Sequence, residues 1–207
     1  RKSYFSNSQT LPNALVNVGN FAPGFGTSRT VNLTVTSVNN TEDWFEGRAE
    51  IIVDYPATVR NYTATFTSCC KISTLANNRD RDYLITTIVS IGDDNQSPVI
   101  SLPPYLNMPK SNSLITYQLA ATDPDGDSIS YHLTTNGSFG SGSIQSPVVS
   151  ITPQGLLSVN TSSYPIGSLI NANVTITDSK GVSIMTDFII KITETSTPPV
   201  FDYAITP

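Results

Sequence analysis

Two adjacent cysteines, Cys69 and Cys70, are the only thiols of this chain and its first candidates for side-chain chemistry. Successive residues of a strand point to opposite faces, and neighbouring Cα atoms lie about 3.8 Å apart, below the usual disulfide range of about 4.4–6.8 Å. Three states are therefore open: a vicinal disulfide in a turned backbone, two free thiols, or bonds to cysteines of neighbouring chains. A zinc site is not expected, because adjacent cysteines and a single histidine supply no separated ligands.

The other reactive residues do not form a catalytic pattern. His132, the only histidine, stands in the alternating run SYHLT (130–134), where a strand side chain facing solvent is expected. PGFGTS (23–28) lacks the lysine and the helix of a phosphate loop, and no Gly-x-Ser-x-Gly elbow occurs. NNRDRD (77–82) is typical of a solvated turn. We predict that the protein is not an enzyme.

Composition narrows the class of protein. Only 13% of residues are charged, about half the usual share, and the net charge is −5. Without a basic patch to displace counterions, nucleic acid is not expected as a partner. No run approaches about 18 apolar residues, so no membrane insertion is expected in this segment. The chain opens at Arg1 without a signal-like stretch, which we interpret as a processed mature chain or a piece of a longer one.

Seven Asn-x-Ser/Thr sequons occur, where chance would give about four. Together with the low charge, this excess favours a secreted, glycosylated protein of the extracellular surface. The candidate acceptors are Asn32, Asn39, Asn61, Asn95, Asn136, Asn160 and Asn173.

Apolar and polar residues alternate with a period of two along most of the chain, which predicts an all-β fold. SIMTDFIIKIT (183–193), for example, places Ile184, Phe188, Ile190 and Ile192 on one face. No stretch sustains helical spacing between caps, and short strands at this spacing suggest sandwiches. The predicted strands cover 31–38, 49–55, 62–68, 82–91, 115–122, 129–135, 173–178 and 183–193.

A sequence pattern that occurs twice predicts the domain boundary. DDNQSPVISLPPY (93–105) is matched by TSTPPVFDYAITP (195–207) at an offset of 101 residues, a plausible domain length. A polar, proline-containing joint followed by two apolar residues is typical of an inter-domain linker and a first strand. The predicted division is one β-sandwich containing the Cys-Cys strand at 1–96, a second sandwich at 97–197, and a linker with an orphan strand at 198–207.

The orphan strand suggests assembly. Its alternating apolar residues need a partner edge, and adding them to the open sheet of a neighbouring copy gives head-to-tail, non-closing assembly. The assembly residues are Val200, Phe201, Tyr203 and Ile205. The alternative is that the segment begins a third domain of a longer chain.

The second predicted domain resembles the cadherin-like repeat, in particular the dystroglycan-type Ig-like sandwiches of large extracellular adhesion proteins. The resemblance rests on LAATDPDGDSISYHL (119–133), NVTITDSKG (173–181), the closing FIIKIT (188–193) and the entries PVI and PVF. It implies two tandem Ig/cadherin-like β-sandwiches with a C-terminal extra strand.

The same resemblance implies calcium at the joint between the domains, since hard cations take several carboxylate and carbonyl oxygens. The residues that match the family's ligands are Asp93, Asp94, Asn95, Asp123, Asp125 and Asp178. SVNTSSYPIGS stands where the family carries Asp-Arg-Glu, and the exit linker lacks paired aspartates, so the second joint should not hold a full cluster. The alternative is that Asp-Pro-Asp-Gly-Asp is a tight turn only.

The first predicted domain resembles the β-modules that precede such repeats in large extracellular microbial proteins, through DWFEG (43–47), CCKISTLAN (69–77) and the SPV boundary. Trp44, the only tryptophan, is expected to anchor the core or an edge, with ligand stacking as the alternative.

These observations predict a non-catalytic extracellular structural or adhesive protein that assembles head-to-tail into a filament or tandem array. One alternative is a calcium-rigidified ligand-binding segment of a longer cell-surface adhesin, and another is an accessory domain of a carbohydrate-acting enzyme. The expected partners are copies of the chain, neighbouring domains of the same chain, glycans or surface proteins.

Overall fold

The chain folds into β-strands joined by loops. The computed structural model describes residues 12–41, 44–92, 94–103 and 105–195, and these contain no helix, so no helix that could span a membrane is found among them. The predicted all-β class is confirmed. The strands of the first half are β1 (Leu15–Ala22), β2 (Arg29–Asn39), β3 (Trp44–Arg48), β4 (Asn61–Ser68) and β5 (Tyr83–Ser90). Those of the second half are β6 (Val99–Ile100), β7 (Leu106–Pro109), β8 (Ile115–Gln118), β9 (Ala121–Thr122), β10 (Ile129–Leu133), β11 (Val149–Ile151), β12 (Leu156–Val159), β13 (Leu169–Asp178) and β14 (Ser183–Thr193).

The second half is a sandwich with its own apolar core. Strands β10, β13, β14 and β7 form one layer, and the sheet β11-β12-β8 packs against it. Every member of the main buried cluster comes from this half, and Leu157, Ile170 and Ile190 in it are fully buried. Burial at about 25 cal/mol per Å² makes this cluster the main hydrophobic contribution to folding. On β14, Phe188, Ile190 and Ile192 are buried in the core, as the alternation predicted.

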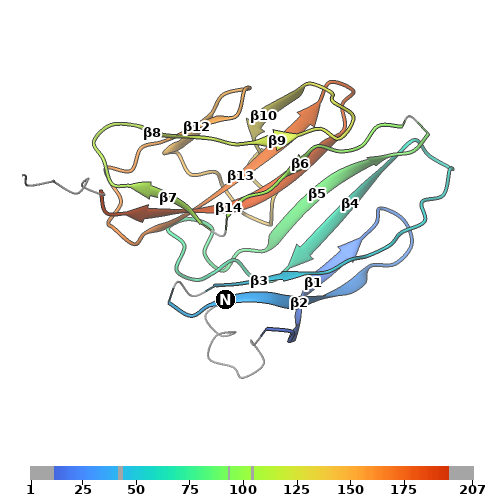
Figure 1. Cartoon of the computed structure of the whole chain (residues 1–207), viewed down its shortest axis with the longest axis horizontal. Helices are drawn as coiled ribbons and strands as arrows, with labels where there is room; N and C mark the ends of the chain where they lie inside the picture. The colour runs from blue at the N-terminus through green and yellow to red at the C-terminus, as the bar shows by residue number, and fades with distance from the viewer. Residues whose placement is uncertain (1–11, 42–43, 93, 104, 196–207) are drawn as a thin grey trace, which may run out of the picture.

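The first half forms a single layer that continues the main layer of the second half. The strands run in the order β10-β13-β14-β5-β4-β1-β2-β3, and β5 joins β14 through the antiparallel pair Thr87 and Ile184 (Figure 1). Only a few of its apolar residues are fully buried, among them Val35, Ala64 and Leu75. The predicted domains at 1–96 and 97–197 therefore meet within one nine-stranded sheet, and the predicted strand at 198–207 lies outside the described residues.

Most predicted strands are present, but several differences remain. Residues 49–55 carry no strand, and Ile52 is 78% exposed, so the prediction there was wrong. The run 115–122 divides into β8 and β9 at Leu119, where the chain changes sheet. The prediction missed the short strands β3, β7, β11 and β12. It also missed β1, in which a register shift between Asn17 and Gly19 interrupts the alternation.

The loop between β4 and β5, residues 69–82, crosses from the first half to the second. Leu75 forms a parallel bridge to Leu169, and the Ala76 N–H donates to the Leu169 carbonyl at 2.7 Å. This contact is on the edge of β13 that β10 leaves open, because β10 pairs only from Val174 onward. The loop thus extends the sheet of the second half with residues of the first.

Candidate functional site

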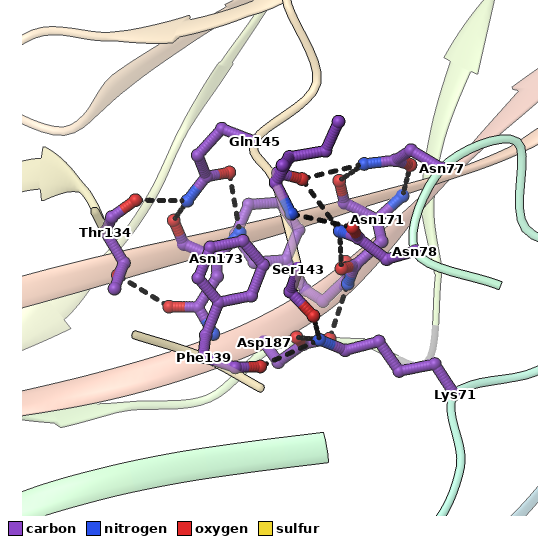
Figure 2. Close-up of polar contacts among 12 residues, drawn as sticks. Lys71, Asn77, Asn78, Thr134, Phe139, Ser143, Gln145, Asn171, Asn173 and Asp187 are labelled. Carbon is purple, nitrogen blue, oxygen red and sulfur yellow. Dashed lines mark hydrogen bonds and ion pairs between the residues drawn. The ribbon is translucent and has the colours of Figure 1, made fainter. Parts of the chain in front are cut away.

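The crossing loop buries a lysine against the second half. The Lys71 ammonium lies 3.1 Å from Oδ2 of Asp187 on β14, and their side chains are 2% and 6% exposed. Lys71 also donates to the Phe139 carbonyl at 3.0 Å and to Ser143 Oγ at 3.3 Å, and its Nζ lies 4.7 Å from the Phe139 ring centre. Three side chains of the second half thus surround one cation of the first half (Figure 2).

Two asparagines of the crossing loop hold β13 beside this pair. Asn77 forms a double contact with the backbone of Asn171, donating to its carbonyl at 3.0 Å and accepting from its N–H at 2.8 Å. The Asn78 amide donates to Asn171 Oδ1 at 2.8 Å, and Asn171 Nδ2 donates to Asp187 Oδ1 at 2.6 Å. The amide of Asn171 is therefore fixed at both its oxygen and its nitrogen (Figure 2).

The polar row continues along β13 to Asn173. Its Oδ1 accepts from Thr134 Oγ1 at 2.6 Å, and its backbone contacts Gln145, whose amide also donates to the Thr134 carbonyl at 2.9 Å. Asn171 and Asn173 are both fully buried. A row of this kind costs little only when its members are paired, which makes the junction specific to one packing of the two halves.

Burial dominates the electrostatics of the junction. Desolvation raises the pKa of Asp187, while Lys71 and the neighbouring asparagines oppose that rise. Burial also raises the pKa of Tyr83 well above its usual range, with the charge of Asp187 adding to the effect. The carboxyl of Asp187 is thus held in a poorly solvated place where its protonated form is favoured relative to water.

A cavity of about 650 Å³ opens between this junction and the first-half sheet. Its walls are largely aliphatic and aromatic side chains of β1, β2, β4 and β5, and Lys71, Asn171 and Asp187 stand at one side. Both cysteines also line it. The junction therefore has an apolar surround and a path to the outside.

The structure joins Cys69 and Cys70 by a disulfide, directly before Lys71. This is the first of the three states considered for the pair. Since the two residues are neighbours, the bond shapes the loop at its start and does not connect distant strands. Cys69 is exposed and Cys70 half-buried, so one side of the bond faces solvent.

The vicinal bond has a direct mass test. We expect the unreduced chain to be a monomer that is lighter by two hydrogens than the reduced chain, with Cys69 and Cys70 in one peptide. A Cys69→Ser/Cys70→Ser double variant, which cannot form the bond, should show no change on reduction. Unreduced multimers that reduction dissolves would instead indicate bonds between chains, and two alkylatable thiols without reduction would indicate free cysteines.

A second cluster, which we call the acidic corner, consists of Asp123, Asp125 and Asp127 between β9 and β10. One ligand oxygen from each lies within 4.8 Å of the others. Asp123 Oδ1 accepts the N–H groups of Asp125 and Asp127, as in the turn foreseen from Asp-Pro-Asp-Gly-Asp. Its Oδ2 is buried without a hydrogen-bond partner.

The acidic corner also contacts the linker between the halves. Gln96 donates its backbone N–H to Asp125 Oδ2 at 2.6 Å. The backbone and side-chain hydrogen bonds from Gln96 lower the pKa of Asp125. Asn95 is buried, donates to Asp178 at 2.9 Å, and leaves its Oδ1 without a hydrogen-bond partner. Lys180 lies 2.9 Å from Asp127, and the hydrogen bond and the neighbouring carboxylates raise the pKa of Lys180.

The residues predicted to bind metal are thus only partly gathered. Asp123 and Asp125 are together, and Asn95 lies one residue before their contact at Gln96. Asp178 accepts the N–H groups of Lys180 and Val182, which fixes the β13–β14 turn. Asp94 is exposed, and Asp93 lies outside the described residues. The prediction omitted Asp127, which belongs to the same aspartate run.

The remaining predicted residues lie on the surface or outside the described chain. His132 is exposed on β10, and Trp44 is half-buried at the end of the sheet, as for an edge anchor. The sequons at Asn95 and Asn173 are buried, so the fold leaves no room for a glycan there. The other acceptors are exposed or half-buried: Asn32, Asn39, Asn61, Asn136 and Asn160. Val200, Phe201, Tyr203 and Ile205 lie outside the described residues.

Comparison with known families gives a match for the first half. Residues 1–92 match the family model described as integrin beta-like protein A-E, N-terminal. The chain is 43% identical to integrin beta-like protein C of Dictyostelium discoideum over 111 residues, 51% of this chain, and 32% identical to integrin beta-like protein A over 176 residues, 77% of this chain. It spans only 6% and 9% of the lengths of these two relatives.

Solved structures are more distant. The human desmocollin-1 ectodomain has a TM-score of 0.36 and 14% identity, over 79% of this chain and 31% of its own. The Ig1-2 module of the Drosophila receptor tyrosine phosphatase DLAR has a TM-score of 0.29 and 14% identity, over 55% of this chain and 63% of its own. TM-scores this low support no conclusion about the fold, so the all-β class is established by the strands of this chain alone.

Sequence reasoning missed the junction, although it is the most polar buried part of the described chain. NNRDRD was expected to be a solvated turn, but Asn77 and Asn78 bond to β13, and Asn78 is buried. The sequence did contain one signal: Asn173 begins the predicted strand NVTITD (173–178), and Asn171 stands two residues before it. Both are polar residues beside positions that the alternation places in the core. Their partners lie far away in the sequence, where no local pattern points to them.

Proposed function

We propose that this chain is a non-catalytic extracellular module of an adhesion-type surface protein, in which the two halves act as one rigid unit. The observation that carries the proposal is the match of residues 1–92 to the N-terminal model of the integrin beta-like proteins. The relatives are much longer than this chain, as expected if the module is one part of a large surface protein. The low charge and the exposed sequons support a secreted or cell-surface location.

A cell-binding assay tests the proposal. The chain is immobilised on beads, and retention of Dictyostelium discoideum cells is measured under flow, with the same chain heat-denatured before coating as the control. We expect several-fold more cells on the native coating, and competition by soluble native chain. Equal retention on both coatings would argue against an adhesive surface.

We further propose calcium binding at the acidic corner. Asp123, Asp125 and Asp127 would hold the ion, because their carboxylates already lie together and Asp123 Oδ2 is buried without a hydrogen-bond partner. Asn95 Oδ1 is a further candidate oxygen. Such an ion would neutralise the like charges and tie the linker to the second half. Lys180 currently supplies part of that neutralisation through Asp127.

Calcium should raise the melting temperature of the chain, and chelator should reverse the change. We expect Asp123→Asn to remove the calcium effect and Lys180→Gln to strengthen calcium binding several-fold, since it removes a competing cation. Asp80→Asn, an exposed aspartate in the crossing loop, is the matched control. Identical melting temperatures with calcium and with chelator would show that the acidic corner is a tight turn that binds no calcium.

Assembly with other copies is the second candidate function. β3 (Trp44–Arg48) ends the nine-stranded sheet, so one of its sides is not paired with a strand among the described residues. The period-two pattern of the C-terminal segment would suit addition to such an edge. We propose that a strand from a second copy joins here.

Sedimentation velocity over a range of concentrations measures this assembly. We expect mass to increase with concentration in the wild-type chain and to stay monomeric in a Phe201→Asp/Tyr203→Asp variant, which loses the apolar face of the strand. Asp202→Asn, on the other face of that pattern, should assemble normally. A wild-type chain that remains monomeric at high concentration contradicts the proposal.

A further inference from the structure

Lys71, Asp187 and Asn171 place an amine, a carboxyl group and a carboxamide in contact within the protein. Asp187 bridges the other two, with Oδ2 at 3.1 Å from Lys71 Nζ and Oδ1 at 2.6 Å from Asn171 Nδ2. All three side chains are buried. These are the groups needed to exchange an amide nitrogen: a nucleophile, a proton carrier and an electrophile with its leaving group.

We propose that Lys71 and Asn171 become joined by an intramolecular isopeptide bond, with Asp187 transferring the protons. The bond would connect the first half to the second at the junction described above, where the adjacent cysteines cannot. It requires no cofactor and does not depend on the proposed adhesive function.

The reaction balances without an oxidant or a second substrate. A proton first passes from the Lys71 ammonium to the Asp187 carboxylate, leaving a neutral amine and a neutral acid. The amine lone pair then attacks Cγ of Asn171 and forms the new C–N bond. As the C–Nδ2 bond breaks, its electron pair stays with Nδ2, which takes a proton from Asp187 and leaves as ammonia. The proton lost from Nζ returns to Asp187.

The surroundings favour each part of this exchange. Asn78 donates to Asn171 Oδ1 at 2.8 Å, so negative charge developing on that oxygen meets a fixed donor. Burial raises the pKa of Asp187, which favours the neutral acid that must deliver a proton. The Phe139 ring, with its centre 4.7 Å from Nζ, covers the amine with an apolar surface. On that side the ring shields the amine from water.

Positioning of the reacting groups also lowers the activation barrier. Groups held in contact inside a fold react as if present at effective concentrations of about 10⁵ M or more. The Asp187 carboxylate contacts both Lys71 and Asn171 (Figure 2), so the reaction requires only that the flexible Lys71 stem move toward Asn171. The adjoining cavity, with Lys71, Asn171 and Asp187 in its wall, gives the ammonia an exit.

Neighbouring asparagines are less suitable electrophiles. Asn173 directs its Oδ1 to Thr134 at 2.6 Å and does not line the cavity. Asn77 uses its side-chain amide to pair with the backbone of Asn171. Asn171 Nδ2 donates to Asp187 Oδ1 at 2.6 Å, whereas Asn173 Nδ2 is buried without a hydrogen-bond partner.

Intact mass of the full chain provides the first test. The protein is made in a host that does not glycosylate, then reduced, alkylated and denatured before measurement. We expect the folded wild-type chain to be lighter than its sequence by one ammonia. Lys71→Arg, which keeps the cation but removes the primary amine, and Asp187→Ala should show the full mass. Lys180→Arg, a change at an exposed lysine, should keep the deficit.

A peptide map identifies the bond itself. Trypsin does not cleave after an acylated lysine, so residues 61–79 should remain intact and appear as a branched peptide with 111–180. Fragmentation should place the branch at Lys71 and Asn171. Because the wild-type map decides the question, the test holds even if a variant fails to fold.

Three results would overturn the proposal. They are a wild-type chain of full mass, a deficit confined to 111–180 without the branched peptide, as succinimide formation at an asparagine, which also releases ammonia, would give, and a branch at Asn173 or another residue.

Discussion

Replacing Lys71 with methionine should lower the free energy of unfolding by about 3–5 kcal/mol, the usual cost of leaving one member of a buried ion pair without its partner. Methionine keeps most of the length of the stem, so lost packing is a small part of the effect. What remains is the Asp187 carboxylate, 6% exposed and deprived of its nearest cation. Urea denaturation of the folded chain measures the loss.

A second substitution separates charge from packing. In Lys71→Met/Asp187→Leu the stranded carboxylate is gone, and apolar replacement of a buried pair is often close to neutral. We expect the double variant to be more stable than Lys71→Met by most of this amount. Both variants lack the Lys71 amine, so the comparison is independent of any bond to Asn171. Equal instability of the single and double variants would show that packing, not charge, is responsible.

The pH dependence of the single variant follows from the sign of the Asp187 shift. Burial raises the pKa of Asp187 in the folded chain, and removing Lys71 removes the largest influence that lowers it. A group with a raised folded pKa contributes its stability below the unfolded pKa and loses it as pH rises through the folded pKa. The deficit of Lys71→Met relative to the double variant should therefore be small in acid and grow toward neutral pH.

The sequence predicts the elements that alternate without interruption. SIMTDFIIKIT coincides with β14, because Ile184, Phe188, Ile190 and Ile192 face the core of the second half from one side of the strand. β1 was missed because the register shift at Gly19 breaks its period. Residues 49–55 alternate as a strand would, yet Ile51 lines the cavity while Ile52 is exposed, and no neighbouring strand pairs with them among the described residues.

The site was harder to predict than the fold for a physical reason. The aspartate run of the acidic corner is local, so its residues reveal themselves by spacing, and three of its carboxylates do lie together. Lys71 and Asp187 are joined only by the packing of two distant segments. Asp187 even lies on the face of β14 opposite its core residues, where alternation predicts an ordinary surface position. Long-range partners of this kind require the fold itself.

Gly140→Ala should lower the free energy of unfolding by about 2–5 kcal/mol, through backbone strain and steric overlap together. We expect no other added methyl group at the junction to be as destabilising. Gly140 has a φ of +125°, and a Cβ there would overlap the backbone carbonyl oxygen of Asp82, at the end of the crossing loop. Neither partner is a flexible side-chain end, so the two segments must separate. Gly137→Ala is the matched control, with a φ of +83° in open space.

The difference between these two variants measures how tightly the halves are held together. Both incur the cost of a positive φ, but only Gly140→Ala displaces the crossing loop, which positions Lys71 through its N–H bond to the Arg81 carbonyl at 2.7 Å. Hydrogen exchange at the Lys71 amide should therefore accelerate in Gly140→Ala and stay slow in Gly137→Ala. If both variants lose equal stability and exchange alike, the loops at 69–82 and 134–148 move independently, and the two halves are not one rigid unit.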